Sequence, residues 1–270
     1  MKRLPRRIRF LAAFFVVLLG VFWGVVNAKL GSVKFESSRH EPLSHLLIVG
    51  LDARPGGDKG LPDTLMLLDL GTGEFEQIPR NWQFSLLDPD AHLVTKYLGI
   101  EACEPFCSIQ AVYAFSKLGL EPPITEDKSL DTLARIVESE YRLPSVAVLA
   151  FDLTWAYSFF ARVAPVTFEL GEAVPVGGSM IDDGYSGVKR MIEPGLRQFY
   201  GGDLYWIARA RFGTSNEDRM RRQTELVEAI RHQKNLVEII SAGWGAQGFF
   251  ATDLQITELL RLATVTNPSN

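Results

Sequence analysis

The chain has 270 residues, of which 47% are hydrophobic and 22% charged, a composition that is typical of globular proteins and excludes a disordered chain. Its 32 acidic and 28 basic side chains give a formal net charge of −4, so we expect no nucleic-acid partner. At this length we expect one large domain or two small ones.

The N-terminal segment has the pattern of a membrane anchor. Residues 1–9 hold a cluster of lysines and arginines, and the uncharged run 10–28 is long enough to cross a bilayer as a helix. Basic flanks stay in the cytoplasm, so we expect a single-pass protein of the cytoplasmic membrane, with the N-terminus inside and the domain outside. A cleaved signal peptide is the alternative, because Val26 and Ala28 have the spacing of a cleavage site. We favour the anchor, because a cleavable apolar core is usually about 7–15 residues long.

The domain begins after a polar juxtamembrane linker, residues 29–44. Residues 46–51 form a short apolar run and predict a buried strand. Residues 64–70 and 74–78 are joined by a glycine-containing turn and predict a β-hairpin. Two strands are therefore expected to lie next to each other near the start of the domain.

Strands and helices alternate through the rest of the chain, which predicts an α/β fold: three layers, α/β/α, around a central mixed sheet. We assign residues 45–240 to the main domain and residues 241–270 to a C-terminal helix that completes it. The expected elements, in chain order, are a helix over 109–118, a helix over 129–140 capped by Ser129, a strand over 146–151, a helix capped by Asp152, a strand over 163–170, a glycine-rich loop over 171–201, a helix ending near 234 and a helix over 253–263 capped by Thr252.

Residues 209–223 carry five arginines although the chain as a whole is negatively charged. On a helical wheel, Arg219, Arg222 and Gln223 continue the apolar stripe that Leu226 begins, so they face the core. Cations that face a core near a helix N-terminus need a partner. A bound anion and acidic side chains from elsewhere in the chain are equally good candidates at this point.

Acidic and basic residues also gather around the first two strands. Asp52 ends the first strand and Asp63 begins the second, so both carboxylates lie at one edge of the sheet if the strands are neighbours. Arg54 lies between them in sequence, and Arg80 follows the hairpin. Two carboxylates at such a rim suit Mg²⁺, with Mn²⁺ as the alternative metal, together with phosphate oxygens of a ligand. Taken singly, Asp63 is better explained as a turn residue, and its coincidence with the inward Arg219 and Arg222 is what favours a site.

Cys103 and Cys107 are the two cysteines of the chain. In an oxidising compartment their spacing allows a local disulfide. With no further cysteine available, we expect no structural zinc site.

An ordered set of motifs resembles the LytR-CpsA-Psr family. The resemblance covers roughly residues 45–235 and depends on the order and spacing of the whole set, because no single motif is specific. The motifs are Ile48-Val-Gly-Leu-Asp-Ala-Arg54, Asp63-Thr64, Ile78-Pro-Arg80, Ile109-Gln-Ala-Val-Tyr113, Arg209-Ala-Arg211 and Arg219-Met-Arg-Arg-Gln223.

The resemblance implies an α/β/α catalytic domain over 45–240 and a phosphotransferase that moves a glycopolymer from a polyprenyl-pyrophosphate carrier to peptidoglycan or another wall acceptor. It implies that Mg²⁺ bridges the pyrophosphate and is held by Asp52 and Asp63. The catalytic residues it implies are Asp52, Asp63, Arg80 and Arg219. The pyrophosphate contacts it implies are Arg54, Arg80, Arg209, Arg211, Arg219, Arg222 and Gln223.

The sequence departs from the family pattern at three places. Asn81 and Asn216 stand where the family has aspartates, and Ser108 and Gln110 replace a lysine and an asparagine. Lys96 is a candidate substitute for that lysine if its loop folds back. The arginines remain, so anion binding is expected to survive these changes.

Three functions therefore stay open. The first is transfer of the glycopolymer, with Asp52, Asp63 or Asp218 as general base. The second is non-catalytic binding of the lipid-linked glycan, and the third is hydrolysis of the lipid pyrophosphate. The aromatic residues Trp155, Phe159 and Phe160 are candidates to line the space for the lipid, but an aromatic stripe at helical spacing is more often core.

Overall fold

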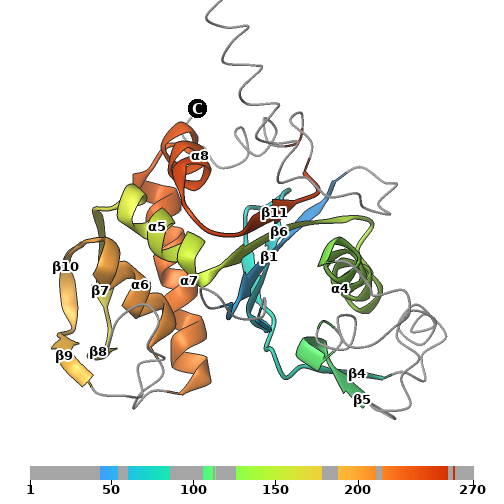
Figure 1. Ribbon diagram of the computed structural model, residues 1–270, viewed down its shortest axis with the longest axis horizontal. Coiled ribbons are helices and arrows are strands. Elements are labelled where there is room, and N and C mark those ends of the chain that lie inside the picture. Colours follow the sequence, from blue (N-terminus) through green and yellow to red (C-terminus); the bar gives the residue numbers. More distant parts are fainter. Residues whose placement is uncertain are drawn as a thin grey trace, which may run out of the picture. The chain divides into compact units, whose positions relative to one another are not determined.

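A five-stranded mixed sheet forms the centre of the fold (Figure 1). Its strands are β1 (His45–Leu51), β2 (Pro62–Asp69), β3 (Phe75–Gln77), β6 (Val146–Asp152) and β11 (Phe250–Thr252). The strand order is β11-β6-β1-β2-β3, and β1 runs parallel to β6 but antiparallel to β2. The predicted α/β class, the first strand and the hairpin of β2 and β3 are confirmed.

The computed structural model describes residues 43–53, 60–85, 106–111, 113, 126–177, 188–210, 215–254 and 258. These residues belong to one unit, Glu36–Asn270. Within the described ranges, no helix has both the length and the apolar character that crossing a bilayer requires. The predicted anchor, residues 10–28, and Cys103 lie outside them, so the possible disulfide between Cys103 and Cys107 stays a prediction.

Helices flank both sides of the sheet. The relevant elements are α4 (Glu126–Tyr141), α5 (Leu153–Val163) and α7 (Asn216–Gln233). Figure 1 shows α4 on one side and α5 and α7 on the other. On the side that α7 approaches, Gly50 has Thr64 and Phe151 as its cross-strand partners. Thr64 contacts Gln223 of α7 there.

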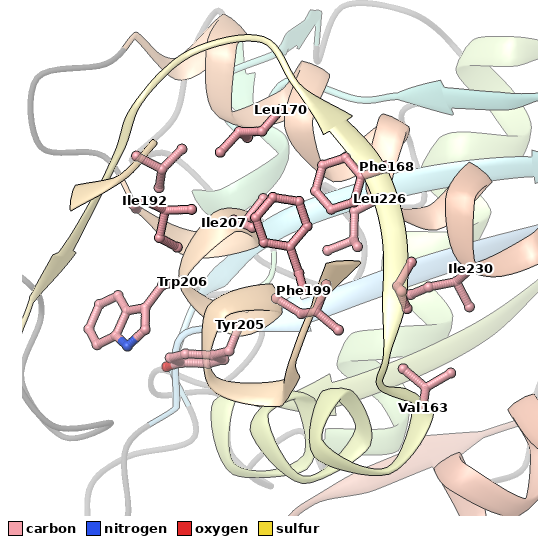
Figure 2. Packing of buried hydrophobic residues seen from close by; sticks show 14 of the residues in the cluster. Val163, Phe168, Leu170, Ile192, Phe199, Tyr205, Trp206, Ile207, Leu226 and Ile230 are labelled. Carbon is pink, nitrogen blue, oxygen red and sulfur yellow. The ribbon is translucent and has the colours of Figure 1, made fainter. Parts of the chain in front are cut away.

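A second core lies among α5, α7 and a set of short strands (Figure 2). Its further elements are β7 (Val166–Leu170), β8 (Val174–Gly177), β9 (Val188–Ile192), β10 (Gly195–Phe199), α6 (Gly201–Arg209) and α8 (Leu236–Gly245). Strands β7 and β10 pair with each other, as do β8 and β9. Phe168, Phe199 and Leu226 pack together in this core, and Ile207 of α6 is fully buried in it. Both α6 and α7 contribute buried side chains to this core.

Several sequence predictions need correction. Residues 171–201 were expected to form a loop because of their glycines, but β8, β9 and β10 lie there, because burial of Val174, Ile192 and Phe199 outweighs local composition. The helix expected from Ser129 begins at Glu126, so that Ser129 lies inside α4 and is buried.

The boundaries near the C-terminus also differ. The α8 helix and strand β11 were not predicted. Thr252 lies in β11, where its hydroxyl donates a hydrogen bond of 2.7 Å to the Val148 carbonyl and accepts one of 3.1 Å from the Leu254 amide, the contact expected of a helix cap. Most of the helix predicted over 253–263 lies outside the described residues. The predicted cap at Asp152 is confirmed, since its carboxylate accepts from the Trp155 amide at 2.7 Å.

Two further short strands, β4 (Gln83–Ser85) and β5 (Phe106–Ser108), form a pair of their own in the region expected to be irregular. The next residue, Ile109, donates its amide to the Trp82 carbonyl at 3.0 Å. Ser108 accepts a hydrogen bond from the Ala111 amide at 3.2 Å, which satisfies a donor at the start of the following helical turn.

Candidate active site

A β-bulge at the start of β2 determines the direction of the site's central carboxylate. Gly50 of β1 is opposite Thr64, but the next residue, Leu51, is opposite Pro62, so Asp63 is the extra residue. In a regular strand, Asp63 and Thr64 point to opposite faces. Here both contact α7: Asp63 binds Arg219 and Thr64 binds Gln223. The bulge therefore brings two consecutive side chains to one helix.

The other carboxylate, Asp52, follows directly after β1. Its amide donates a hydrogen bond of 2.9 Å to the Leu61 carbonyl, so the returning chain passes close to it. Gly60 makes this approach possible: its φ is +53°, and a Cβ atom there would lie 2.3 Å from the Asp52 carbonyl carbon. Since β1 and β2 are antiparallel neighbours, the end of β1 and the start of β2 lie at one edge of the sheet, as predicted.

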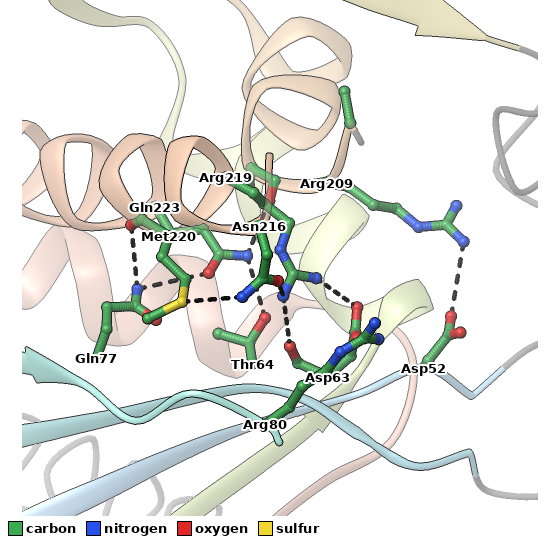
Figure 3. Close-up of polar contacts among 12 residues, drawn as sticks. Asp52, Asp63, Thr64, Gln77, Arg80, Arg209, Asn216, Arg219, Met220 and Gln223 are labelled. Atoms are coloured by element: carbon green, nitrogen blue, oxygen red, sulfur yellow. Dashed lines mark hydrogen bonds and ion pairs between the residues drawn. The ribbon is translucent and has the colours of Figure 1, made fainter. Parts of the chain in front are cut away.

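Asp63 joins two arginines from distant parts of the chain (Figure 3). Its Oδ1 accepts a hydrogen bond of 2.7 Å from Nη1 of Arg80, and its Oδ2 accepts one of 2.7 Å from Nη1 of Arg219. Nη2 of Arg219 also donates to the Asp63 carbonyl at 3.1 Å and to Oδ1 of Asn216 at 2.8 Å. The Arg219 side chain is 3% exposed and that of Arg80 is 36% exposed, so the cluster extends from the interior to the surface.

Arg209 and Asp52 form the second charged pair of this rim (Figure 3). Nη2 of Arg209 lies 3.6 Å from Oδ1 of Asp52, whose side chain is 41% exposed. Nη1 of Arg209 donates a hydrogen bond of 3.1 Å to the Tyr205 hydroxyl one helical turn earlier. The pair is looser than the Asp63 cluster and more open to solvent.

Arg222 differs from the other predicted contacts because it is fully buried. Its Nε and Nη2 donate to the carbonyls of Ile207 and Ala210 at 3.1 and 2.6 Å, and its Nη1 donates to Glu172 at 2.7 Å. The two carbonyls belong to the C-terminal end of α6, where a helix leaves acceptors without intrahelical partners. A ligand could reach this guanidinium only if these bonds opened.

Gln223 is also buried and links three elements. Its side-chain amide donates to the Thr64 hydroxyl at 3.1 Å and to the Ala208 carbonyl at 2.8 Å, and its oxygen lies 3.5 Å from Nε2 of Gln77. Gln77 in turn donates to the Met220 carbonyl at 3.3 Å. Gln223 therefore holds β2, α6 and α7 together behind the arginines.

The start of α7 has a complete capping box. The Ser215 hydroxyl accepts from the Asp218 amide at 3.0 Å, and the Asp218 carboxylate accepts from the Ser215 amide at 3.0 Å. Hydrogen bonds from Ser215 hold the pKa of Asp218 below its usual value. Asp218 is thus committed to the helix terminus, which argues against the general-base role considered for it.

The helical wheel of the arginine stretch is confirmed. The buried residues of α7 are Arg219, Arg222, Gln223, Leu226 and Ile230, which are the residues assigned to the inward face. Arg221 is 44% exposed and pairs with the surface carboxylates of Glu172, Asp218 and Glu225. Arg54, Lys96 and Arg211, which the sequence also assigned to the site or its vicinity, lie outside the described residues.

Solved structures share this arrangement of strands and helices. TagV of B. subtilis matches with a TM-score of 0.57 at 20% sequence identity, over 84% of this chain and 80% of TagV. The chain has the LytR-CpsA-Psr fold. This confirms, at the level of the fold, the resemblance carried by the motifs. No protein-family profile matches the chain, and no curated protein does.

Two further structures with the same fold show how far the likeness extends. The gbs0355 protein of Streptococcus agalactiae matches with a TM-score of 0.58 at 16% identity, over 86% of this chain and 77% of its own. TagT, in a structure of the protein bound to LI-WTA, matches with a TM-score of 0.52 at 17% identity, over 83% of this chain and 74% of TagT. Identities this low establish the shared fold alone.

The carboxylates at the edge of the sheet where β1 ends and β2 begins are of the kind that could bind one divalent metal ion. Asp52 and Asp63 supply carboxylates, which Mg²⁺ combines with ligand phosphate oxygens. The Asp63 oxygens also accept hydrogen bonds from Arg80 and Arg219, so a metal would share this carboxylate with the two arginines. Among the described residues, no group of three or more histidine, cysteine or acidic side chains is arranged to hold a metal. A metal here would therefore depend on the ligand for most of its coordination.

The aromatic stripe of α5 packs as core in this fold. The Trp155 ring stacks on Phe151 and Phe159, with centroids 4.8 and 5.0 Å away, and its Nε1 donates to the Gly243 carbonyl at 3.1 Å. Phe159 and Phe160 lie against the second hydrophobic core. This packing is what the structural interpretation of the stripe predicted, and the lining of a lipid cavity stays a prediction.

Three residues that shape the site were given no role from the sequence: Gln77, Tyr205 and Thr64, the last of which is part of the Asp63-Thr64 motif. Thr64 follows Asp63 directly, but period-two alternation assigns it to the wrong face without the bulge. Tyr205 precedes Arg209 by one helical turn, a spacing that could have indicated their contact. Gln77 lies in β3, and nothing in the sequence relates it to α7.

Proposed function

We propose that the chain is a membrane-anchored phosphotransferase that moves a glycopolymer from a polyprenyl-pyrophosphate carrier to a hydroxyl of a cell-wall acceptor. The observation that carries the proposal is the convergence of Arg80, Arg209 and Arg219 with two carboxylates at one sheet edge. It is supported by the shared fold of TagT, whose structure contains LI-WTA. The anchor over 10–28 would keep the domain beside the membrane that holds such a carrier.

The arginines would bind the pyrophosphate and neutralise the charge that develops as the bond to the leaving group breaks. Arg80 and Arg209 are the partly exposed members and would make the first contacts. Hydrogen bonds to Asp63 and Asn216 hold the Arg219 guanidinium in one orientation, so it would not have to move when the ligand binds. Preorganised donors of this kind favour the transition state because they need no rearrangement during the reaction.

In the proposed reaction, the acceptor oxygen forms a bond to the phosphorus that carries the glycan, and the bond from that phosphorus to polyprenyl phosphate breaks. The acceptor hydroxyl loses its proton to a base. Asp52 suits this role best, because Asp63 accepts two arginines and Asp218 is engaged in the capping box. Mg²⁺, or Mn²⁺ in its place, would be held by Asp52 and Asp63 and would supply further charge neutralisation.

Exchange of single arginines tests the proposal. Arg80→Ala and Arg219→Ala should each weaken binding of a polyprenyl pyrophosphate and reduce transfer, by about tenfold or more if a charge-assisted contact is lost. Arg221→Ala is the matched control, since it lies on the same helix but faces solvent. Binding is measured by calorimetry with Mg²⁺, and transfer by the appearance of glycan on the acceptor. Unchanged binding and transfer in both variants would rule the proposal out.

A second candidate is a non-catalytic binder of the same lipid-linked glycan. The specific support is that Asn216 contacts Arg219 through a neutral amide and that Asn81 is exposed in the turn after Arg80, where the family has aspartates. Such a protein would bind the donor without turnover when metal and acceptor are both supplied. Product analysis in the same assay also identifies a pyrophosphatase, which would release the glycan phosphate into water.

A further inference from the structure

We propose that Tyr205 is a positioning residue that holds the guanidinium of Arg209 at the rim, so that Arg209 meets an anionic ligand already oriented. The proposal rests on the function proposed above and adds a residue that belongs to none of the motifs of the family resemblance. Its basis is a hydrogen bond, a ring contact and the burial of the tyrosine, all at the last turn of α6.

The contact geometry fixes one end of the Arg209 side chain. Nη1 donates to the Tyr205 hydroxyl at 3.1 Å, and the Arg209 Cζ lies 5.8 Å from the centre of the Tyr205 ring. Nη2 is directed to Asp52 at 3.6 Å (Figure 3). One guanidinium nitrogen therefore holds the group to the helix while the other reaches the carboxylate.

Tyr205 is itself held firmly. It is 2% exposed, and its ring meets those of Tyr157 and Trp206 edge to face, with centroids 5.5 Å away in both cases. Figure 2 shows the hydroxyl of Tyr205 directed outward from the packed side chains. A buried ring with a fixed hydroxyl is a rigid point of attachment, whereas an arginine has several rotatable bonds and loses much rotamer freedom when it is ordered.

The chemical nature of the partner matters as well as its position. Arg80 and Arg219 share the carboxylate of Asp63, and Arg222 binds Glu172, so their contacts add negative charge. The tyrosine hydroxyl orients Arg209 without adding any. An anion that approaches Arg209 therefore meets a cation that is held by one neutral group, the Tyr205 hydroxyl, and by one carboxylate, Asp52, and the helix C-terminus beside it stabilises that cation.

The experiment compares Tyr205→Phe with wild type, using geranylgeranyl pyrophosphate and Mg²⁺ as the probe in calorimetry. The variant keeps the ring and its packing and removes only the hydroxyl. We expect about fivefold weaker binding, the loss typical of one hydrogen bond, with an unchanged thermal midpoint. Tyr200→Phe is the matched control, because Tyr200 is 60% exposed and its hydroxyl donates to the exposed side chain of Gln198.

A double-mutant cycle separates positioning from a structural effect. In the Arg209→Ala background, Tyr205→Phe should have no further effect on binding, because the hydroxyl acts through Arg209. An equal loss in both backgrounds, or no loss in either, overturns the inference. If Tyr205→Phe has no effect while Arg80→Ala and Arg209→Ala both weaken binding, the inference fails and the proposed function stands. If neither arginine variant weakens binding, the proposed function is wrong, and the inference that rests on it is wrong as well.

Discussion

Arg219 and Arg222 are three residues apart on one face of α7, yet they serve different regions. Arg219 binds Asp63 and lies in a cluster that continues to the half-exposed Arg80. Arg222 is fully buried and binds Glu172 and two carbonyl groups at the end of α6. Two arginines on the same face of one helix therefore have different roles, because different elements lie next to them. Arg219 belongs to the candidate site, whereas Arg222 stabilises the fold.

The two regions are nevertheless connected. The carbonyls that Arg222 binds belong to Ile207 and Ala210, and Arg209 lies between them in sequence. Arg222 therefore fixes the backbone from which Arg209 reaches Asp52. A buried arginine that a ligand does not touch can influence ligand binding in this way, through the position of its neighbour.

Arg222→Ala should give the largest effect and is the strongest test of the comparison. Removal of the Arg222 guanidinium takes these donors from the carbonyls of Ile207 and Ala210 and leaves Glu172 with Arg221, and we expect a loss of about 3 kcal/mol in the free energy of unfolding. Urea titration measures it, with Arg221→Ala as the control, for which the expected change is within about 0.5 kcal/mol. Equal changes in the free energy of unfolding for the two variants would show that Arg222 does not stabilise the fold.

Asn216→Asp sharpens the comparison on the rim side. A carboxylate would make a charge-assisted bond to Arg219 and would also suit the first turn of a helix, so we expect a gain of up to about 1 kcal/mol in stability. We also expect faster transfer, because the variant restores the acid that stands at this position in the family that the sequence resembles. Measurement of transfer rate together with unfolding separates the two gains. A variant that is more stable but transfers no faster would favour the non-catalytic binder.

Asp218 gives the smallest expected effect, and it depends on pH. Because hydrogen bonds from Ser215 lower its pKa in the folded state, the stabilisation is present above the unfolded-state pKa of about 3.9 and is lost as the pH falls through the folded pKa. Asp218→Asn should flatten this part of the stability profile while ligand binding at neutral pH stays the same. A large loss of binding would instead place Asp218 in the active site.

Much of the site could be predicted because its residues occupy positions that local rules define. The periodicity of α7 assigned Arg219, Arg222 and Gln223 to the inward face, and the structure buries all three. The hairpin pattern placed Asp63 near Arg80, and they are bonded at 2.7 Å. The strands within 171–201 escaped prediction, because their stability comes from packing against α6 and α7 and not from their own glycine-rich sequence.

The sequence by itself determined that two arginines of α7 face inward and that carboxylates lie at the end of β1 and the start of β2, because helical and strand periodicity are local properties. Only the tertiary structure decided which arginine meets which partner. The bulge at Asp63 turns that carboxylate to Arg219, and the end of α6 takes Arg222. Both outcomes depend on elements far apart in the chain, whose approach is set by the packing of the whole core.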